Sequence, residues 1–214
     1  MQKTLKFFCF DIFHYLRQGK ISSVISRGIL PLIFLLNNNL DQVKYRFIKF
    51  KNKKSGEITV EINNLYLMNL NLNDRGICKE LSIYKKREYF STDFFKKIIT
   101  DDMIVIDIGA NIGYYTLLES KLAWKGHVYA IEPVPDNFNL LQKNIKINNV
   151  ANVFLYNLAI GDIDAVSEIY IYDKCNWNSF TRNPKGNIIA SIRVPITTLD
   201  SFIQLNLRDH PHII

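Results

Sequence analysis

Two acidic residues at the ends of apolar runs are the side chains best placed to do chemistry. Asp107 lies near the end of the run 103–108, and Glu132 directly follows the run 127–131. Between them, the chain from 107 to 113 reads Asp-Ile-Gly-Ala-Asn-Ile-Gly. Glycines let a backbone approach a ligand closely, and a helix that follows such a turn presents free N–H groups. The sequence therefore predicts a ligand-binding turn with a carboxylate on either side.

The residues of this turn narrow the choice of ligand. A P-loop needs Gly-Lys-Ser/Thr after its glycines, but Tyr-Tyr-Thr follows here, which excludes that kind of phosphate transfer. A dinucleotide turn needs a glycine where Asn111 stands, and a third glycine that is absent. Asp107 would repel a pyrophosphate but suits a ligand with an ammonium group and a sulfonium. S-adenosylmethionine has both, and Glu132 could accept from its two ribose hydroxyls, although an acid at this place also occurs in dinucleotide sites.

The elements around the turn alternate in a way that positions it. We expect strands at 103–108, 127–131 and 153–158, separated by helices at 114–123 and 136–147. The first strand is apolar except for Asp107, which is typical of a strand covered on both faces of a parallel sheet. This order predicts a doubly wound βαβαβ half, in which ligands bind at the carboxyl ends of the strands.

Four segments of the chain resemble one known family. Residues 105–116, 129–138, 157–162 and 197–202 closely resemble the FkbM methyltransferases, and residues 73–77 resemble them weakly. The resemblance implies an α/β fold of the Rossmann-like class I methyltransferase type, with a doubly wound sheet. It also implies methylation, dependent on S-adenosylmethionine, of a hydroxyl on a sugar, a glycan or a related small-molecule acceptor.

The resemblance also assigns site residues. Asp107, Gly109, Ala110, Asn111 and Gly113 correspond to the loop that binds the methionine part of the cofactor, and Glu132 to the ribose acceptor. The residues expected to border the adenine are Asn157, Leu158 and Ala159.

The acceptor side of the site is less defined by the sequence. Trp177 and Ser179 are candidate substrate contacts, because an aromatic ring beside amides suits the face of a sugar. No catalytic base is identified, since His210 and His212 flank a proline before a strand and are interpreted as structural or solvated.

No metal site is expected, because the three cysteines are far apart and we interpret them as reduced thiols.

The end of the chain departs from the family pattern. Residues 209–214 resemble the entry into a fourth strand, after which the family continues. We therefore expect a sheet that is incomplete at the C-terminus, and a fragment with little methyl transfer. Two alternatives to a glycan O-methyltransferase stay open: a cofactor-binding fragment without activity, and a nucleic-acid methyltransferase.

Residues 1–100 are expected to form a helical and β-hairpin extension, and residues 101–214 the partial methyltransferase domain. Within the extension, one or two helices should end at the asparagines 37–39. The segment 44–50 alternates and should pair with 57–62 in a hairpin whose tip is 51–56. A strand at 65–72, a helix from 77, a break at 87–91 and a helix capped by Thr92 should follow.

The basic residues are concentrated near the N-terminus. Residues 1–60 contain eleven Lys and Arg against three Asp and Glu, whereas residues 61–214 contain sixteen against seventeen. Such an excess attracts anionic partners, so we expect weak peripheral contact with anionic membrane surfaces, and nucleic acid binding is not favoured. The apolar run 28–36 is too short to span a membrane and no secretory signal is evident, so we expect a cytoplasmic protein.

Overall fold

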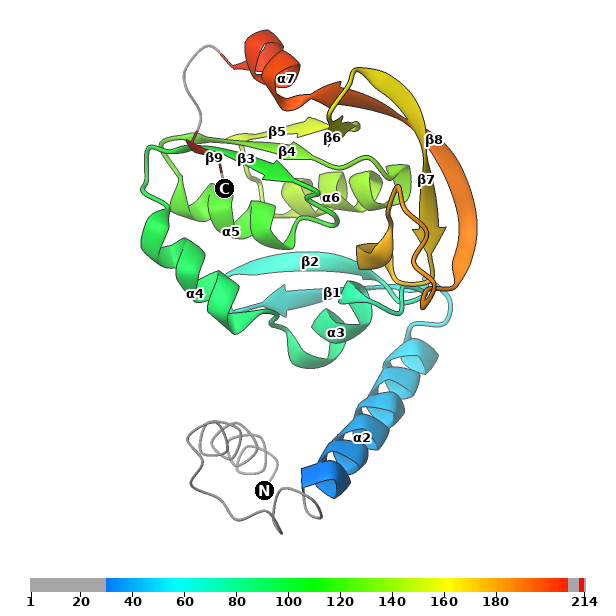
Figure 1. Ribbon diagram of the computed structural model, residues 1–214. Coiled ribbons are helices and arrows are strands. Elements are labelled where there is room, and N and C mark those ends of the chain that lie inside the picture. The colour runs from blue at the N-terminus through cyan, green and yellow to red at the C-terminus, as the bar shows by residue number, and fades with distance from the viewer. Residues whose placement is uncertain (1–29, 208–211, 214) are drawn as a thin grey trace. The chain divides into compact units, whose positions relative to one another are not determined.

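The computed structural model describes residues 30–207 and 212–213 (Figure 1). The chain divides into two units, residues 1–48 and 49–214. The hairpin and the central sheet therefore share one unit, and the functional boundary expected after residue 100 stays a prediction. Within the described residues, no helix is both long and apolar enough to cross a membrane.

The first described element is a single long helix, α2 (Leu30–Lys51). The prediction that a helix ends at residues 37–39 is wrong, and so is the prediction of a strand at 44–50. Asparagine has only a modest penalty in a helix, and the lysines and arginine of 44–51 are good helix formers. An alternation over seven residues is too short to outweigh these propensities. The helix also carries an ion pair between Lys44 and Asp41 at 3.5 Å.

The hairpin forms one segment later than expected, between β1 (Glu57–Ile62) and β2 (Tyr66–Asn71). Its tip is a β-turn in which the N–H of Leu65 donates to the carbonyl of Ile62 at 2.9 Å. Asn63 and Asn64 have φ of 53° and 55°, the left-handed values that asparagine tolerates and that a type I′ turn requires. The strand predicted at 65–72 is confirmed as β2.

Two helices follow the hairpin, α3 (Ile77–Tyr84) and α4 (Tyr89–Ile98). The break between them comes earlier than predicted, and Thr92 does not cap α4. Thr92 is instead buried inside the helix, where its hydroxyl donates to the carbonyl of Arg87 at 3.3 Å. Arg87 lies in this break and is held by ion pairs to Glu80 and Glu88, at 2.6 and 2.5 Å.

The central sheet has the strand order β5-β4-β3-β9. Its members are β3 (Ile104–Ile108), β4 (His127–Ile131), β5 (Val153–Tyr156) and β9 (His212–Ile213), all parallel to their neighbours. The helices α5 (Tyr114–Leu122) and α6 (Pro135–Ile147) connect the first three strands. The order reverses between β3 and β9, which is the topological switch point of a doubly wound sheet. The predicted α/β fold is confirmed.

A second sheet has the order β6-β8-β7. It consists of β6 (Ala159–Gly161), β7 (Ala165–Tyr172) and the long β8 (Ile188–Thr198). The segment between β7 and β8 contains the short helix η2 (Cys175–Trp177). After β8, α7 (Leu199–Asn206) packs Phe202 against Ile106 and Ile131 of the central sheet, on the face opposite α5 and α6 (Figure 1).

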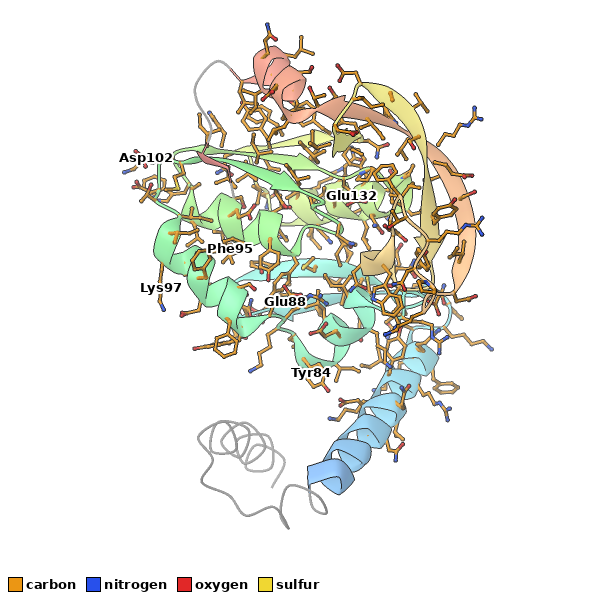
Figure 2. The ribbon with its side chains drawn as sticks, in the orientation of Figure 1. Tyr84, Glu88, Phe95, Lys97, Asp102 and Glu132 are labelled. Atoms are coloured by element: carbon orange, nitrogen blue, oxygen red, sulfur yellow. The ribbon has the colours of Figure 1, made fainter. Side chains whose placement is uncertain are left out.

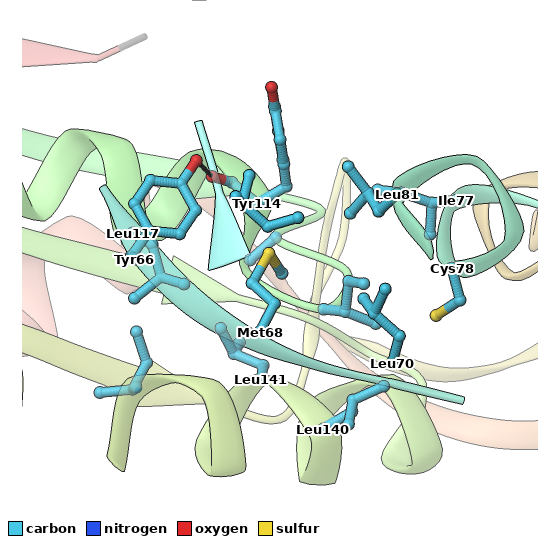
Figure 3. Packing of buried hydrophobic residues seen from close by; sticks show 14 of the residues in the cluster. Tyr66, Met68, Leu70, Ile77, Cys78, Leu81, Tyr114, Leu117, Leu140 and Leu141 are labelled. Atoms are coloured by element: carbon cyan, nitrogen blue, oxygen red, sulfur yellow. Dashed lines mark hydrogen bonds between the residues drawn. The ribbon is translucent and has the colours of Figure 1, made fainter. Parts of the chain in front are cut away.

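The main core lies between α5, α6 and the hairpin (Figure 3). Met68 and Leu70 of β2 are fully buried with Leu117 of α5 and Leu141 of α6. The hydroxyl of Tyr66 donates to the carbonyl of Tyr114, at 3.2 Å, and so ties the hairpin to the start of α5. The hairpin is therefore one wall of the unit that carries the glycine turn.

Asn144 of α6 and Asn148, which directly follows this helix, cover the free edge of β2. Asn144 is fully buried, accepts from the N–H of Asn69 at 2.7 Å and donates to the carbonyls of Asn69 and Ile112 at 3.3 and 2.8 Å. One turn later, Asn148 makes the same reciprocal pair with Leu67. These amides take the place of a neighbouring strand, because edge N–H and C=O groups need partners.

We predict that Asn144→Leu lowers the free energy of unfolding by roughly 2–4 kcal/mol, because it leaves the buried carbonyl of Ile112 and the half-buried backbone N–H of Asn69 without partners. The measurement is urea unfolding followed by circular dichroism. Asn148→Leu is the matched control at an exposed pair and should lose less. Equal losses in the two variants would contradict the role assigned to Asn144.

Candidate functional site

The glycine turn is fixed to the end of β4 by its own backbone. The N–H groups of Gly109 and Ala110 both donate to the carbonyl of Ile131, at 2.9 and 3.0 Å. Gly109, Asn111 and Gly113 have φ of 81°, 51° and 90°. Three left-handed residues within five positions fold the chain back before α5 begins, which explains the glycines at 109 and 113 and the asparagine between them.

Asp107 lies at the mouth of this turn, half-buried near the end of β3. Its Oδ2 accepts a hydrogen bond from the hydroxyl of Thr116, at 2.5 Å. Burial raises the pKa of Asp107 to about 6, against the lowering effect of the Thr116 hydrogen bond. At neutral pH the group is therefore largely a carboxylate, with a preference for a positively charged partner.

Glu132 lies in the interior at the end of β4 (Figure 2). Its Oε2 accepts from the N–H of Asn111 at 2.8 Å, and its Oε1 accepts from the N–H of Val134 at 3.0 Å and from the amide of Asn137 at 3.3 Å. Burial raises the pKa of Glu132, while these hydrogen bonds lower it. The carboxylate therefore links the glycine turn to the start of α6.

The residues expected to border the adenine occupy three different environments. The exposed Asn157 donates from its amide to the carbonyls of Glu132 and Pro133, at 2.8 and 3.1 Å. Leu158 is half-buried and packs in the cluster of Phe202. Ala159, the first residue of β6 in the second sheet, is buried in a cluster with Val134. Asn157 thus holds the turn after β4, and the adenine contacts of the three residues stay predictions.

A segment from the β7–β8 connection lies against the glycine turn. The amide of Asn111 donates to the carbonyl of Cys175, and the thiol of Cys175 donates to Oδ1 of Asn111, both at 3.3 Å. The carboxylate of Asp74 accepts from the N–H of Cys175 at 2.8 Å and from the N–H of Cys78 at 2.8 Å. Asp74 therefore joins the start of α3 to the segment that covers Asn111.

The two candidate substrate contacts lie on the same connection. The ammonium group of Lys174 lies 3.7 Å from the centre of the Trp177 ring, so one face of this ring faces a cation. The Ser179 hydroxyl accepts from the N–H of Thr181 at 3.1 Å, which shapes the local turn. Contact of either residue with a substrate stays a prediction.

Sequence reasoning placed Asp107, Glu132 and the turn correctly at adjacent strand ends, but it missed their partners. Thr116, Asn137 and Cys175 each hold a candidate residue in place, and Asp74 in turn holds Cys175. The weak likeness at residues 73–77 was the one available signal for Asp74. His210 lies outside the described residues, as does the side chain of His212. Among the described residues, no group of three or more His, Cys, Asp or Glu could hold a metal ion.

We predict that Gly113→Ala lowers the free energy of unfolding by about 2–4 kcal/mol, because φ is 90° and a Cβ would come within 2.6 Å of the buried Leu141. The control Gly109→Ala has a similar φ of 81° but open space around the new Cβ, so it should lose about 1–2 kcal/mol. Urea unfolding of both variants measures the difference. A Gly109→Ala loss as large as that of Gly113→Ala would contradict the packing argument.

The comparisons with known proteins agree with the resemblance in the sequence. The family model described as "Methyltransferase FkbM domain" matches residues 107–214, half of the chain. A curated relative from Beauveria bassiana, "Methyltransferase 1", is 32% identical over 79 residues, which cover 37% of this chain and 32% of the relative. A tRNA(Phe) (4-demethylwyosine(37)-C(7)) aminocarboxypropyltransferase from Methanocaldococcus jannaschii is 39% identical over 56 residues, 26% of this chain and 22% of the relative.

Solved structures also match in part. The structure of M. jannaschii TYW2 in complex with AdoMet has a TM-score of 0.37 and 24% identity, covering 47% of this chain and 42% of that one. P. horikoshii TYW2 in complex with MeSAdo has a TM-score of 0.38 and 22% identity, covering 51% and 39%. The matched segments span about a third or less of the curated relatives' lengths. On the family model that matches half of its residues, the chain belongs to the FkbM methyltransferase family.

Proposed function

We propose that this chain binds S-adenosylmethionine at the glycine turn and takes part in methyl transfer to a hydroxyl of a sugar, a glycan or a related acceptor. The observation that carries the proposal is the pair of carboxylates at the ends of two adjacent parallel strands, Asp107 and Glu132, with the turn of 109–113 between them. Family membership supports the methyl-transfer chemistry.

The residues present fit the cofactor's charged and polar groups. Asp107 is a half-buried carboxylate that suits the ammonium group of the methionine part. A carboxylate offers about four acceptor positions, and Glu132 already fills three of them with protein donors. Glu132 would therefore accept from one ribose hydroxyl through its Oε2, rather than from both.

When bound, the cofactor supplies an electrophilic methyl group. The role of this chain is to orient the cofactor, with Asp107 and Glu132 fixing two of its parts. The hydrogen bonds of Asn111 to Glu132 and Cys175 keep the turn rigid. Good alignment of reacting groups supplies a large share of the rate enhancement in group transfer. The acceptor would approach along the β7–β8 connection, where Trp177 offers an aromatic surface.

We predict that S-adenosylhomocysteine gives saturable heat in titration calorimetry, and that Asp107→Asn weakens its binding at least tenfold, since a charge-assisted hydrogen bond is worth about 1.5–3 kcal/mol. Asp162→Asn removes an exposed carboxylate on the β6–β7 turn and is the matched control. Unchanged affinity in a folded Asp107→Asn protein would refute the assignment of the ammonium group to Asp107. Absence of heat with the unmodified chain would refute cofactor binding at this turn.

The basic segment suggests where a large acceptor or a surface would approach. Six lysines and arginines lie within residues 44–54, at the end of α2 and after it, together with the exposed rings of Phe47 and Phe50. Basic residues beside exposed aromatic rings favour an anionic interface. We propose peripheral contact with anionic lipid, and we keep RNA as the alternative because one relative is named for action on tRNA.

We predict that the chain cosediments with vesicles containing phosphatidylserine at low salt. Replacing Lys51, Lys53 and Lys54 by Gln should weaken binding by ~1 kcal/mol for each lysine close to the surface. Lys185→Gln, on the β7–β8 connection, is the control for the loss of a single positive charge elsewhere and should change binding by less than the loss of any one of the three lysines. A parallel titration with mixed RNA decides between the partners: RNA binding that persists at high salt would contradict the lipid proposal, since contacts to phosphate alone weaken steeply as salt rises.

A further inference from the structure

A buried carboxyl group that the proposed function leaves unused lies on α5. Glu119 is 2% exposed, and its Oε2 is buried without a hydrogen-bond partner. If this carboxyl were ionised, its Oε2 would have lost its hydration without gaining a donor, which is strongly unfavourable. Glu119 therefore needs either a proton or a nearby positive charge.

Helix geometry places Glu119 beside the candidate ammonium subsite. Thr116 and Glu119 are three residues apart on α5 and so share one face of the helix. Thr116, which is fully buried, donates its hydroxyl hydrogen bond to Oδ2 of Asp107, so this face is the one turned to the end of β3. The pKa of Glu119 is raised well above its usual range, mainly by burial and also by the negative charge of Asp107.

The charged groups around this subsite are all acidic. Asp107 on β3 acts on Glu119, and it also raises the pKa of Glu132 at the end of β4. The other titratable side chains of α5 reach elsewhere: Tyr114 donates to the carbonyl of Arg87, Tyr115 donates to Glu88 beside α4, and Lys121 donates to a carbonyl of the hairpin. Within residues 39–207, none of the ion pairs involves the three carboxyls. The cluster thus lacks a cation that a ligand could supply.

We propose that Glu119 is a second carboxyl of the ammonium subsite, which carries a proton in the free protein and releases it when a cationic ligand binds at Asp107. This inference rests on the proposed function, because it needs a ligand with an ammonium group. Asp107 contacts the ligand, whereas Glu119 acts through Asp107 and is a positioning residue. No covalent bond to the ligand forms: the proton leaves the Glu119 oxygen for the solvent, and the arriving positive charge balances the new carboxylate.

The proposal explains why two carboxyls occupy one subsite. With Glu119 neutral, the free protein avoids a second negative charge near the half-buried carboxylate of Asp107, and two such charges would repel each other. When the ammonium group binds, it stabilises both negative charges. The bound ligand is then attracted by two carboxylates, whereas the free protein has only one ionised carboxyl in this subsite. Binding then becomes tighter as the pH rises, because deprotonation of Glu119 accompanies it.

The experiment counts the protons released when S-adenosylhomocysteine binds. Calorimetric titrations at pH 7.5 in phosphate and in Tris, whose ionisation enthalpies differ, give this number directly. The unmodified chain should release between about half a proton and one proton per ligand, and Glu119→Gln close to none. Between pH 7 and 8 the affinity of the unmodified chain should rise by up to about tenfold, whereas that of Glu119→Gln should stay nearly constant.

Further variants and measurements distinguish failure of this inference from failure of the proposed function. Glu119→Asp retains a carboxyl and should restore proton release, which a merely structural role of Glu119 would not predict. Equal proton release in the unmodified chain and in Glu119→Gln would overturn this inference and leave the proposed function intact, whereas absence of binding at any pH would overturn the proposed function. If Glu119→Gln does not fold, carbon-13 spectra of labelled carboxyls in the unmodified chain decide, and an ionised Glu119 at pH 7 without ligand would overturn the inference.

Discussion

The carboxylate of Glu132 joins the parts of the chain that the candidate site depends on. It accepts from the backbone of Asn111 in the glycine turn and from Val134 and Asn137 at the start of α6, all within a nearly inaccessible interior. A buried carboxylate is tolerable only when several donors surround it, and removing one partner of such a network costs more than an ordinary hydrogen bond. The turn, the end of β4 and α6 are therefore fixed together, and a ligand would meet a preformed surface there.

On the other side of the turn, single side chains again form hydrogen bonds with several groups at once. Asn144 in α6 satisfies the edge of β2 and the carbonyl of Ile112, and Cys175 satisfies both ends of the Asn111 amide. Asp74 fixes Cys175 in turn. Segments that are far apart in the sequence thus support one short loop. Precise placement of a ligand depends on such supporting contacts as well as on the residues that touch it.

The sequence reveals the parts of this arrangement that are local. An apolar run that ends in Asp107 and a turn with glycines at 109 and 113 need only neighbouring residues to be recognised, and the predicted strands and helices from 103 to 147 agree with the structure. The prediction of a strand at 44–50 is wrong because a short alternation of basic and aromatic residues is also compatible with a helix. The contacts of Asp74 with Cys175, 101 residues apart, leave no periodic signal in either segment. Glu119, whose pKa is raised in part by the charge of Asp107, looks like an ordinary helix residue until its burial is known.

The negative charges of the acidic subsite link the stability of the folded chain to the binding of a positively charged ligand. Burial raises the pKa values of Asp107, Glu119 and Glu132 in the folded state. Groups with raised folded pKa values stabilise the fold while they are protonated, and this contribution is lost as the pH rises through the folded values, near pH 6 for Asp107 and higher than usual for the others. At neutral pH the ionised carboxylates of the acidic subsite therefore lower the free energy of unfolding of the free chain. A ligand that brings a positive charge to the subsite returns that stability, so recognition of the cofactor and completion of the fold draw on the same electrostatic interaction.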